Sequence, residues 1–362
     1  MTVQIYNAEN ERLKRRYFAY LKEARRYSES SIDHAADALH RFEKYTRFKE
    51  FRKFHIEQAI AFKRKLSEQR NSVSGEPLSK ATVCGALAAL KAFFLWLAGQ
   101  PGFRSRLSYS DAEYFSLSEK DTVIAKAKRD RPVPSLDQIL HLLRQMPHES
   151  GIERRNRALI AFTLLTGARD GATASLKLRH IDLEEGKVFQ DARDVKTKFS
   201  KTFTTWFFPV GEEPLAIVAD WVRYLTKDKL FGPSDPMFPG TKMGLSPDLR
   251  FCIQGLSREH WATAAPIRQI FKEAFPAAGL PYFNPHSFRN TLAQLAEQRC
   301  STPEEFKAWS QNLGHEKVMT TFTSYGTVPG TRQAEIIRRL ALPKTGEAGV
   351  LAEIEKLINA RR

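Results

Sequence analysis

The sequence predicts a mainly α-helical fold with a small antiparallel β-sheet, an α+β architecture in two domains. Three features lead to that prediction. Apolar residues recur at helical spacing through most of the chain. Between residues 180 and 210 this spacing gives way to the two-residue alternation of strands, with turn-like segments between the runs. A basic stretch punctuated by proline, residues 103–133, separates two regions of helical periodicity and is typical of a linker.

The length and composition of the chain also favour two domains. Its 362 residues exceed a typical single domain, and its apolar residues, 42% of the total with 25 Phe, are enough for two buried cores. We expect an N-terminal helical domain at 1–115, a basic linker at 116–133, a second domain at 134–342 and a helical tail at 343–362.

The first domain is expected to contain four helices. Apolar residues at helical spacing place them at 8–26, from Ser28 onward, at 55–70 and at 80–98. Ser28 can cap the free N–H groups of the second helix, and Gly99 followed by Pro101 ends the fourth. Because the connections between them are short, these helices are predicted to form a small bundle.

In the second domain, helices precede and follow the sheet. We expect helices at 135–146, 154–166 and 170–178, strands at 180–183, 187–191 and 202–210, and then helices at 212–228, 263–279, 286–299, 303–312 and 316–325. Residues 184–186 and 195–201 are the turns between the strands. Thr302, followed by Pro303 and Glu305, is a typical helix start. Two further helical segments, 331–341 and 347–361, close the chain.

The charge of the chain points to a polyanionic partner. With 57 Lys and Arg against 41 Asp and Glu, the formal charge is +16 and the pI is near 9.7. A folded chain this basic favours nucleic acid as its partner. A merely basic protein is the alternative on charge alone, and charge does not specify a reaction.

Cysteine usage and hydropathy favour a cytoplasmic protein without a structural metal. Cys84, Cys252 and Cys300 are far apart and odd in number, which fits neither a disulfide framework nor a zinc motif. No segment approaches the ~18 consecutive apolar residues of a membrane span, and the first residues lack the basic head and apolar run of a secretory signal. We therefore expect neither a membrane partner nor secretion.

Two arginines lie where they could bind an anion. His286 and Arg289 are three residues apart and share one face of the helix predicted at 286–299. A guanidinium can hold a phosphate through two parallel hydrogen bonds, and the first turn of a helix also favours an anion. Arg169 follows a Thr-Gly-Ala sequence at the junction of two helices, where the glycine lets it project into a cleft. Each arginine by itself also fits an ordinary surface position.

A second histidine and a tyrosine follow. His315 comes after a Leu-Gly pair at a helix end, and Tyr325 ends the next predicted helix. A tyrosine hydroxyl, with a reference pKa of ~10, is a weak nucleophile near neutral pH, so it needs a proton acceptor and cations that activate the phosphorus it attacks. The histidines and arginines above are groups of that kind. They predict that Tyr325 attacks a phosphodiester that they hold.

Taken in order, Thr-Gly-Ala-Arg at 166–169, His-x-x-Arg at 286–289, Leu-Gly-His at 313–315 and the tyrosine at 325 resemble the tyrosine recombinase/integrase family. The likeness extends over roughly residues 10–340. It implies a four-helix, SAM-like core-binding domain followed by a tyrosine recombinase catalytic domain, which together would clamp duplex DNA. It also implies a site-specific recombinase or integrase of a mobile or chromosomal element.

The resemblance implies a role for each of these side chains. Tyr325 would be the nucleophile, forming a 3′-phosphotyrosyl link and freeing a 5′-hydroxyl. Arg169 and Arg289 would stabilise the charge that develops on the non-bridging oxygens. His286 and His315 would hydrogen-bond the phosphate or handle the tyrosine proton.

The family's general acid is a lysine in a hairpin turn of the small sheet. In this chain that turn contains Lys196, Lys198 and Lys201. We choose Lys196, which lies where the second strand gives way to the turn, and Lys198 is a close second. The lysines that are not used would contact phosphate.

The chain departs from the family pattern at two places. The family often has an acidic residue three positions after the first arginine, where this chain has Ala172; Asp170 is the nearest acid, and its role is unassigned. The interval from His315 to Tyr325 is ten residues, one more than we expect. One added residue turns a helical side chain by ~100°, so we expect a local bulge or a looser segment before the tyrosine.

The resemblance also implies partners and cofactors. Neither metal nor ATP is expected, because protein cations replace the metal and the phosphotyrosyl link retains the energy of the phosphodiester. The chain also lacks a phosphate-binding Gly-x-x-x-x-Gly-Lys-Ser/Thr loop.

Double-stranded DNA is the expected partner, bound by a homotetramer on paired sites, and accessory DNA-bending factors are further candidates. The apolar face predicted at 347–361 suits docking on a neighbouring subunit or on its own domain. A type IB-like topoisomerase and a catalytically silent DNA-binding regulator are the alternatives.

Overall fold

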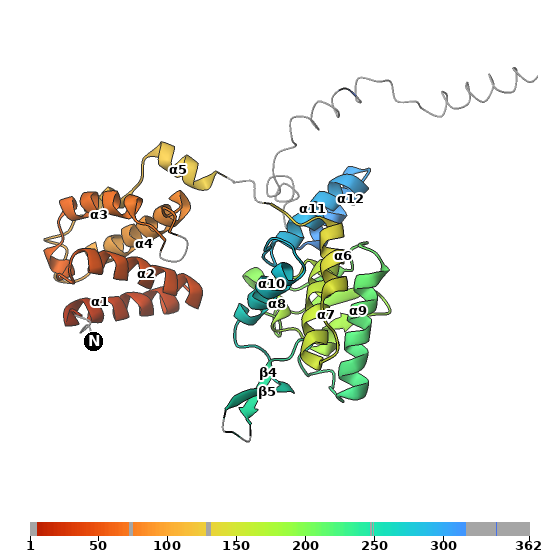
Figure 1. Ribbon diagram of the computed structural model, residues 1–362. Coiled ribbons are helices and arrows are strands. Elements are labelled where there is room, and N and C mark those ends of the chain that lie inside the picture. Colours follow the sequence, from red (N-terminus) through yellow and green to blue (C-terminus); the bar gives the residue numbers. More distant parts are fainter. Residues whose placement is uncertain are drawn as a thin grey trace, which may run out of the picture. The chain divides into compact units, whose positions relative to one another are not determined.

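The structure is a computed structural model that describes residues 6–71, 75–127, 132–246, 248, 250–315 and 338. The chain divides into two compact units, Met1–Arg129 and Asp130–Arg362, each with its own buried core (Figure 1). The prediction of a mainly helical fold with a small antiparallel sheet is confirmed. Tyr325 and the helices predicted at 316–325, 331–341 and 347–361 lie outside the described residues, apart from Arg338.

Unit 1 (Met1–Arg129) contains the four helices predicted for it. They are α1 (Ala8–Ala19), α2 (Glu29–Tyr45), α3 (Ile56–Glu68) and α4 (Lys80–Ala98). Side chains cap three of them: Asn7 caps α1, Ser28 caps α2 and Ser79 caps α4. α1 continues as a turn of π-helix, Tyr20–Ala24, so its helical backbone ends close to the predicted bound.

Aromatic rings fill the centre of unit 1. Phe42 of α2 and Phe94 of α4 meet edge to face with ring centroids 5.6 Å apart, and Phe115 stacks 5.0 Å from Phe94. A buried carboxylate joins α1 to α2, since Glu43 accepts hydrogen bonds from Asn10 Nδ2 at 3.0 Å and from Lys14 Nζ at 2.7 Å. A buried charge pair therefore connects α1 to α2, and ring packing connects α2 to α4.

Part of the stretch that resembled a linker is folded. Residues Tyr109–Phe115 form a 3₁₀ helix against α4, with Phe115 fully buried, and α5 (Glu119–Lys126) follows. Phe103 and Leu107 enter the same core. They stand among basic and polar residues, and that composition favoured a linker over a folded segment.

By length and composition alone, α4 could cross a membrane. The core helix of a globular domain meets the same criterion, and α4 is such a helix. Its Leu87, Leu90, Phe93 and Phe94 are at most 1% exposed. The hydropathy of α4 is thus explained by its place in the core of unit 1.

Unit 2 (Asp130–Arg362) combines helices with a three-stranded antiparallel sheet. The helices are α6 (Leu136–Gln145), α7 (Gly151–Thr166), α8 (Asp170–Thr173), α9 (Glu212–Arg223), α10 (Ala265–Ala277), α11 (Ser287–Arg299) and α12 (Pro303–Asn312). The strands β1 (Ile181–Asp182), β2 (Lys187–Gln190) and β3 (Phe203–Trp206) pair in the order β1-β2-β3, with Val188 opposite Thr205. These strands lie within the ranges predicted for them.

α7 runs through the core of unit 2. All residues from Ala158 to Thr166 are buried, so the C-terminal end of the helix lies inside the unit. Phe208, just after β3, donates its backbone N–H to the carbonyl of Leu165 at 2.7 Å. The sheet is therefore attached to the end of α7, which is where the Thr-Gly-Ala-Arg sequence begins.

Unit 2 also contains a hairpin that the sequence analysis did not predict, β4 (Thr241–Leu245) paired with β5 (Phe251–Leu256). Met243 lies opposite Ile253 and Leu245 opposite Phe251, and all four side chains are more than half exposed. The hairpin projects from the helices of its unit (Figure 1). An irregularity in register between Lys242 and Met243 breaks the two-residue alternation, which explains why the pattern was missed.

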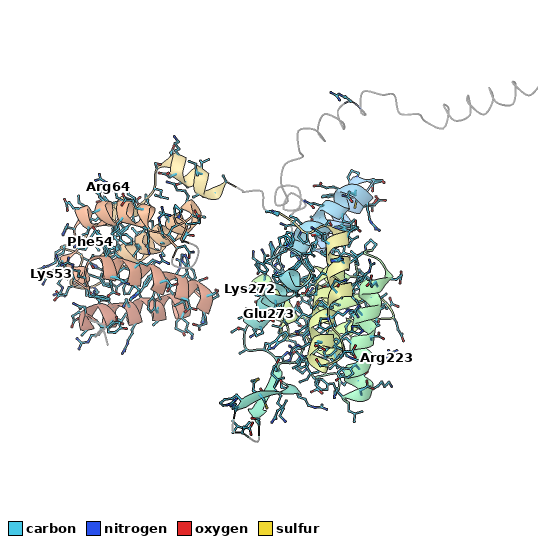
Figure 2. The ribbon with its side chains drawn as sticks, in the orientation of Figure 1. Lys53, Phe54, Arg64, Arg223, Lys272 and Glu273 are labelled. Carbon is cyan, nitrogen blue, oxygen red and sulfur yellow. The ribbon has the colours of Figure 1, made fainter. Side chains whose placement is uncertain are left out.

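Charged side chains lie on the outer surface of both units. Lys53 and Arg64 of unit 1, and Arg223, Lys272 and Glu273 of unit 2, are exposed (Figure 2). Charges in such positions can meet solvent or a polyanion without loss of core packing.

Candidate active site

Three segments of unit 2 meet at the side chain of Arg289. This residue lies in the first turn of α11 and is only 3% exposed. Nη1 donates a hydrogen bond to the carbonyl of Gly167, and Nη2 donates one to the carbonyl of Leu313. Nη2 also lies 3.1 Å from Nε2 of His315. One guanidinium therefore joins the Thr-Gly-Ala-Arg and Leu-Gly-His sequences, although Gly167 and Leu313 lie 122 and 24 residues from it in the chain.

Gly167 makes this junction possible by ending α7 in a left-handed conformation. Its φ is 58°, and its N–H donates to the carbonyl of Thr163 at 2.9 Å. A Cβ atom at this position would lie 3.0 Å from side-chain carbons of both Leu292 and Leu313. The backbone angle and the packing both require glycine, and the chain then turns so that Arg169 precedes α8.

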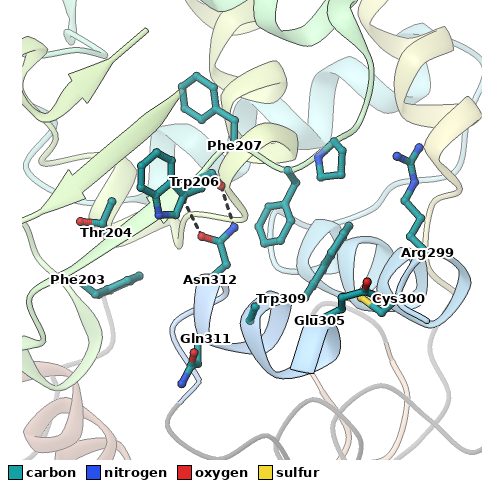
Figure 3. Close-up of a pocket in the computed structure, with 13 residues that line it drawn as sticks. Phe203, Thr204, Trp206, Phe207, Arg299, Cys300, Glu305, Trp309, Gln311 and Asn312 are labelled. Carbon is teal, nitrogen blue, oxygen red and sulfur yellow. Dashed lines mark hydrogen bonds between the residues drawn. The ribbon is translucent and has the colours of Figure 1, made fainter. Parts of the chain in front are cut away.

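His315 is positioned by the end of α12 and by β3. The side chain of Asn312 pairs with the backbone of Trp206: Oδ1 accepts from its N–H at 2.7 Å, and Nδ2 donates to its carbonyl at 2.8 Å (Figure 3). Gly314 follows with a φ of 71°, and a Cβ there would lie 3.0 Å from the ring of Phe203. The turn that carries His315 toward Arg289 is therefore fixed against the sheet.

A narrow pocket opens beside this junction. Its walls include Arg169, Lys198 and Arg289, together with residues from the end of α7 and from β3. Arg169 is half-buried at the start of α8. The pocket thus gathers three cationic side chains from three separate segments, and guanidinium and ammonium groups attract anions such as phosphate.

The two histidines of this region are neutral near pH 7. Burial, followed by the charges of Arg289 and Arg169, lowers the pKa of His315 to about 4. The same causes in the same order lower the pKa of His286, which precedes α11 and has a more exposed side chain. Two neutral imidazoles beside cations can donate or accept a hydrogen bond at a bound phosphate.

We expect the protein to lose stability as the pH falls from about 6.5 to about 4. Unfolded, His315 takes up its proton near the reference pKa of ~6.5, whereas folded it does so only at about 4. Between these values the unfolded state binds more protons, so stability present above pH 6.5 is lost toward pH 4. Urea unfolding at steps across this range measures the loss. His315→Gln cannot titrate and should reduce it; an unchanged slope in that variant contradicts the assignment.

The two lysines considered as general acid lie in different surroundings. Lys198 belongs to the 3₁₀ helix Lys198–Ser200 and lines the pocket with the two arginines. Lys196 is exposed, as Lys198 is, but its backbone N–H donates to Oγ of Ser175 at 2.8 Å and its charge acts on His260. The structure therefore gathers Lys198, rather than Lys196, with Arg169 and Arg289.

The position that is often acidic in the family is occupied by a buried small residue. Ala172 is 2% exposed and lines the pocket. Asp170 accepts a hydrogen bond from Nε of Arg268 at 2.6 Å and one from the backbone N–H of Gly171 at 2.9 Å. Through Arg268, Asp170 ties α10 to the start of α8.

Sequence reasoning missed the polar residues that hold the site together. Asn312, Ser175 and Asp194 each connect two segments through side-chain hydrogen bonds. They belong to no apolar period and to no motif, so no signal in the sequence marks them. Of the predicted set, the structure brings together Arg169, His286, Arg289 and His315, with Lys198. Tyr325 lies outside the described residues.

Comparison with known families and proteins gives consistent matches. The profile of the phage integrase family matches residues 133–329, more than half of the chain. The chain is 25% identical over 257 residues to tyrosine recombinase XerD of Neisseria meningitidis, a match that covers 69% of this chain and 72% of the relative. It is 22% identical over 276 residues to tyrosine recombinase XerC of Xanthomonas axonopodis pv. citri, covering 75% and 72%.

Solved structures share the fold. A lambda integrase dimer bound to a COC′ core site matches with a TM-score of 0.59 at 15% identity, covering 87% of this chain and 95% of that one. A lambda integrase tetramer bound to a Holliday junction matches with a TM-score of 0.55 at 15% identity, covering 89% and 80%. The XerH recombinase in a post-cleavage complex with palindromic difH matches with a TM-score of 0.54 at 19% identity, covering 90% and 83%.

Proposed function

This chain belongs to the phage integrase family, the tyrosine recombinases, and on that premise we propose that it is a site-specific DNA recombinase acting through a 3′-phosphotyrosyl intermediate. The guanidinium of Arg289 is the observation that carries the proposal. It holds the segments of Gly167 and Leu313 against α11 and lies beside His315. These contacts of Arg289 support a single site for one scissile phosphate. The Thr-Gly-Ala-Arg, His-x-x-Arg and Leu-Gly-His sequences all contribute to it.

In the proposed reaction, the Tyr325 oxygen attacks the phosphorus, so that a tyrosine–phosphate bond forms and the bond from phosphorus to the 5′-oxygen breaks. Arg169 and Arg289 neutralise the charge that develops on the non-bridging oxygens. His315 and His286 hydrogen-bond the phosphate or accept the tyrosine proton. Their lowered pKa values keep both imidazoles neutral near pH 7, which favours the hydrogen-bonding role. A lysine of the β2–β3 connection gives a proton to the leaving 5′-hydroxyl.

Rejoining reverses these steps with a different strand. The incoming 5′-hydroxyl attacks the phosphotyrosyl link and releases Tyr325. One phosphodiester-like bond is exchanged for another, so the proposed reaction needs no ATP. Protein cations neutralise the phosphate, so it needs no metal ion either.

We propose double-stranded DNA as the substrate and a homotetramer on two paired sites as the working assembly. Among the similar structures, lambda integrase was solved as a tetramer on a Holliday junction and XerH on its palindromic site. The net charge of +16 supports binding to a polyanion. The helical domain at 1–115 would bind the core site and the domain at 134–342 would cut it, in the cytoplasm at the nucleoid.

Capture of the covalent complex tests this function. The DNA that the protein binds and cuts in cells is mapped by sequencing, and a nicked duplex carrying that site is incubated with the purified protein. We expect a protein–DNA adduct on the 3′ end that survives a denaturing gel, without added ATP or metal. Binding without an adduct would support a silent regulator. Relaxation of a supercoiled plasmid without the site, by a monomer, would support a topoisomerase.

Two lysines are proposed as the general acid, Lys196 from its place in the sequence and Lys198 from its place beside the pocket. A 5′-hydroxyl needs a proton to leave, whereas a 5′-thiol, with a reference pKa of ~8.5, leaves as the thiolate. We expect Lys198→Ala to cut the ordinary site ~10²–10⁴-fold more slowly and to recover on a site whose scissile 5′-oxygen is sulfur. Loss and recovery in Lys196→Ala instead would identify Lys196 as the acid.

A further inference from the structure

We infer that Asp194 is the positioning residue for the lysine that protonates the leaving strand. The inference rests on the proposed function, since it concerns the connection between β2 and β3 that carries both candidate lysines. This connection, residues 191–202, is long for a hairpin, and its one regular element is the 3₁₀ helix Lys198–Ser200. Its position therefore depends on what ties it to the rest of unit 2.

The carboxylate of Asp194 accepts hydrogen bonds from two side chains of one neighbouring segment, and a third side chain of that segment lies close to it. Oδ1 accepts a hydrogen bond from Nζ of Lys177 at 2.8 Å, and Oδ2 accepts one from Nη2 of Arg179. Nε2 of His180 lies 3.4 Å from Oδ2. All three partners lie at the 3₁₀ helix Leu178–His180, directly before β1. The connection is thus fastened to the first strand of the sheet on which the site is built.

The chemistry of His180 fits this arrangement. Its ring is 4% exposed, and its Nδ1 accepts the backbone N–H of Lys177 at 3.0 Å. A neutral imidazole that accepts at Nδ1 carries its proton on Nε2, which faces Asp194. Burial lowers the pKa of His180, so this neutral form prevails at pH 7. The ring therefore places an uncharged group 3.4 Å from the carboxylate and adds no third positive charge.

Asp194 also offsets positive charge at this point. Lys177 and Arg179 are cations, and the connection that follows Asp194 carries further lysines. Hydrogen bonds from Lys177 and then from Arg179 hold the pKa of Asp194 well below its usual range, so the carboxylate stays ionised at any working pH. Without it, like charges would push the lysine turn away from the segment that supports it.

Two further contacts extend this attachment to the pocket. Val195, the next residue, is 2% exposed in the core. The backbone N–H of Lys196 donates to Oγ of Ser175, which donates to the carbonyl of Ala172 at 3.0 Å in α8. α8 begins directly after Arg169. Asp194 therefore holds one end of a series of contacts that runs through Ser175 to α8. Arg169, directly before α8, and Lys198 line the same pocket.

The same connection offers a matched control. Asp191 also pairs with an arginine, but that partner is Arg193, two residues away and with its side chain 87% exposed. Its carboxylate therefore makes a local pair within the connection. Asp191→Asn removes one carboxylate from this loop, as Asp194→Asn does, without releasing the bonds to Lys177 and Arg179.

The test compares cleavage of two nicked duplexes, one with the ordinary scissile phosphate and one with sulfur in place of the 5′-oxygen. We expect Asp194→Asn to cut the ordinary duplex ~10–100-fold more slowly, because small displacements of a reacting group cost about this much. On the sulfur duplex it should come within about threefold of the wild type, since a thiolate leaves without the lysine proton. Asp191→Asn should match the wild type on both.

Equal losses on the two duplexes, or no loss on either, would overturn the inference. Failure of the proposed function has a different signature, namely no adduct with the wild type, or lysine variants that sulfur does not restore. Circular dichroism and thermal unfolding check the fold of Asp194→Asn. If that variant does not fold, Lys177→Ala, which leaves Arg179 on the carboxylate, should show a smaller loss with the same recovery on sulfur. If Lys177→Ala shows no loss on the ordinary duplex, or no recovery on the sulfur duplex, Asp194 does not position the lysine.

Discussion

Tyr325→Phe is expected to abolish the covalent protein–DNA complex while leaving DNA binding unchanged. Phenylalanine keeps the ring and removes only the oxygen that would attack phosphorus. Loss of a nucleophile in an assembled site lowers the rate by several orders of magnitude, at least ~10⁴-fold here. Adduct formation on the nicked site duplex measures the first effect, and a gel-shift titration of the same duplex measures the second.

Tyr282→Phe is the matched control for this experiment. Tyr282 lies four residues before His286 and is 47% exposed, so it is a second tyrosine close to the proposed site in the chain. We expect this variant to form the adduct at the wild-type rate. An adduct that persists in Tyr325→Phe and disappears in Tyr282→Phe would show that the nucleophile had been misassigned. The two variants also test whether a tyrosine ten residues after His315, one more than the family pattern, can serve as the nucleophile.

Arg289→Lys is expected to damage catalysis and folding together. The ammonium of lysine is one compact donor group and cannot reproduce the planar fork that reaches the carbonyls of Gly167 and Leu313. Each buried carbonyl left without its partner costs ~1–3 kcal/mol, so loss of both should lower the free energy of unfolding by ~2–6 kcal/mol. Cleavage should slow by ~10²–10³-fold, as when a preorganised donor to a developing charge is removed. Urea unfolding and the adduct assay, run where the variant is folded, measure the two effects.

Arg299→Lys tests whether these effects belong to the site. Arg299 lies in the last turn of the same helix, α11, and is exposed. We expect its substitution to change stability by less than ~0.5 kcal/mol and to leave cleavage unaltered. A loss in Arg299→Lys comparable to that in Arg289→Lys would mean that α11 tolerates no arginine substitution, and the central role of Arg289 would then fail.

Local signals were sufficient for much of the fold. α12 occupies the predicted range 303–312, because its cap, its first-turn proline and its apolar stripe are all short-range features. The hairpin β4–β5 was missed because its apolar side chains face solvent and its register is irregular. The 3₁₀ helix Tyr109–Phe115 was missed because the basic, proline-punctuated composition of residues 103–133 favoured a linker.

The sequence by itself determined which side chains are candidates for the chemistry, because short motifs in a fixed order carry that information. Arg169, His286, Arg289 and His315 were all identified in this way. Only the tertiary structure decided what joins them and which lysine accompanies them. The bonds of Arg289 to Gly167 and Leu313, and of Asp194 to Lys177 and Arg179, connect segments that are distant or irregular in the chain. Such contacts depend on how the whole unit packs and have no period or spacing in the sequence that could reveal them.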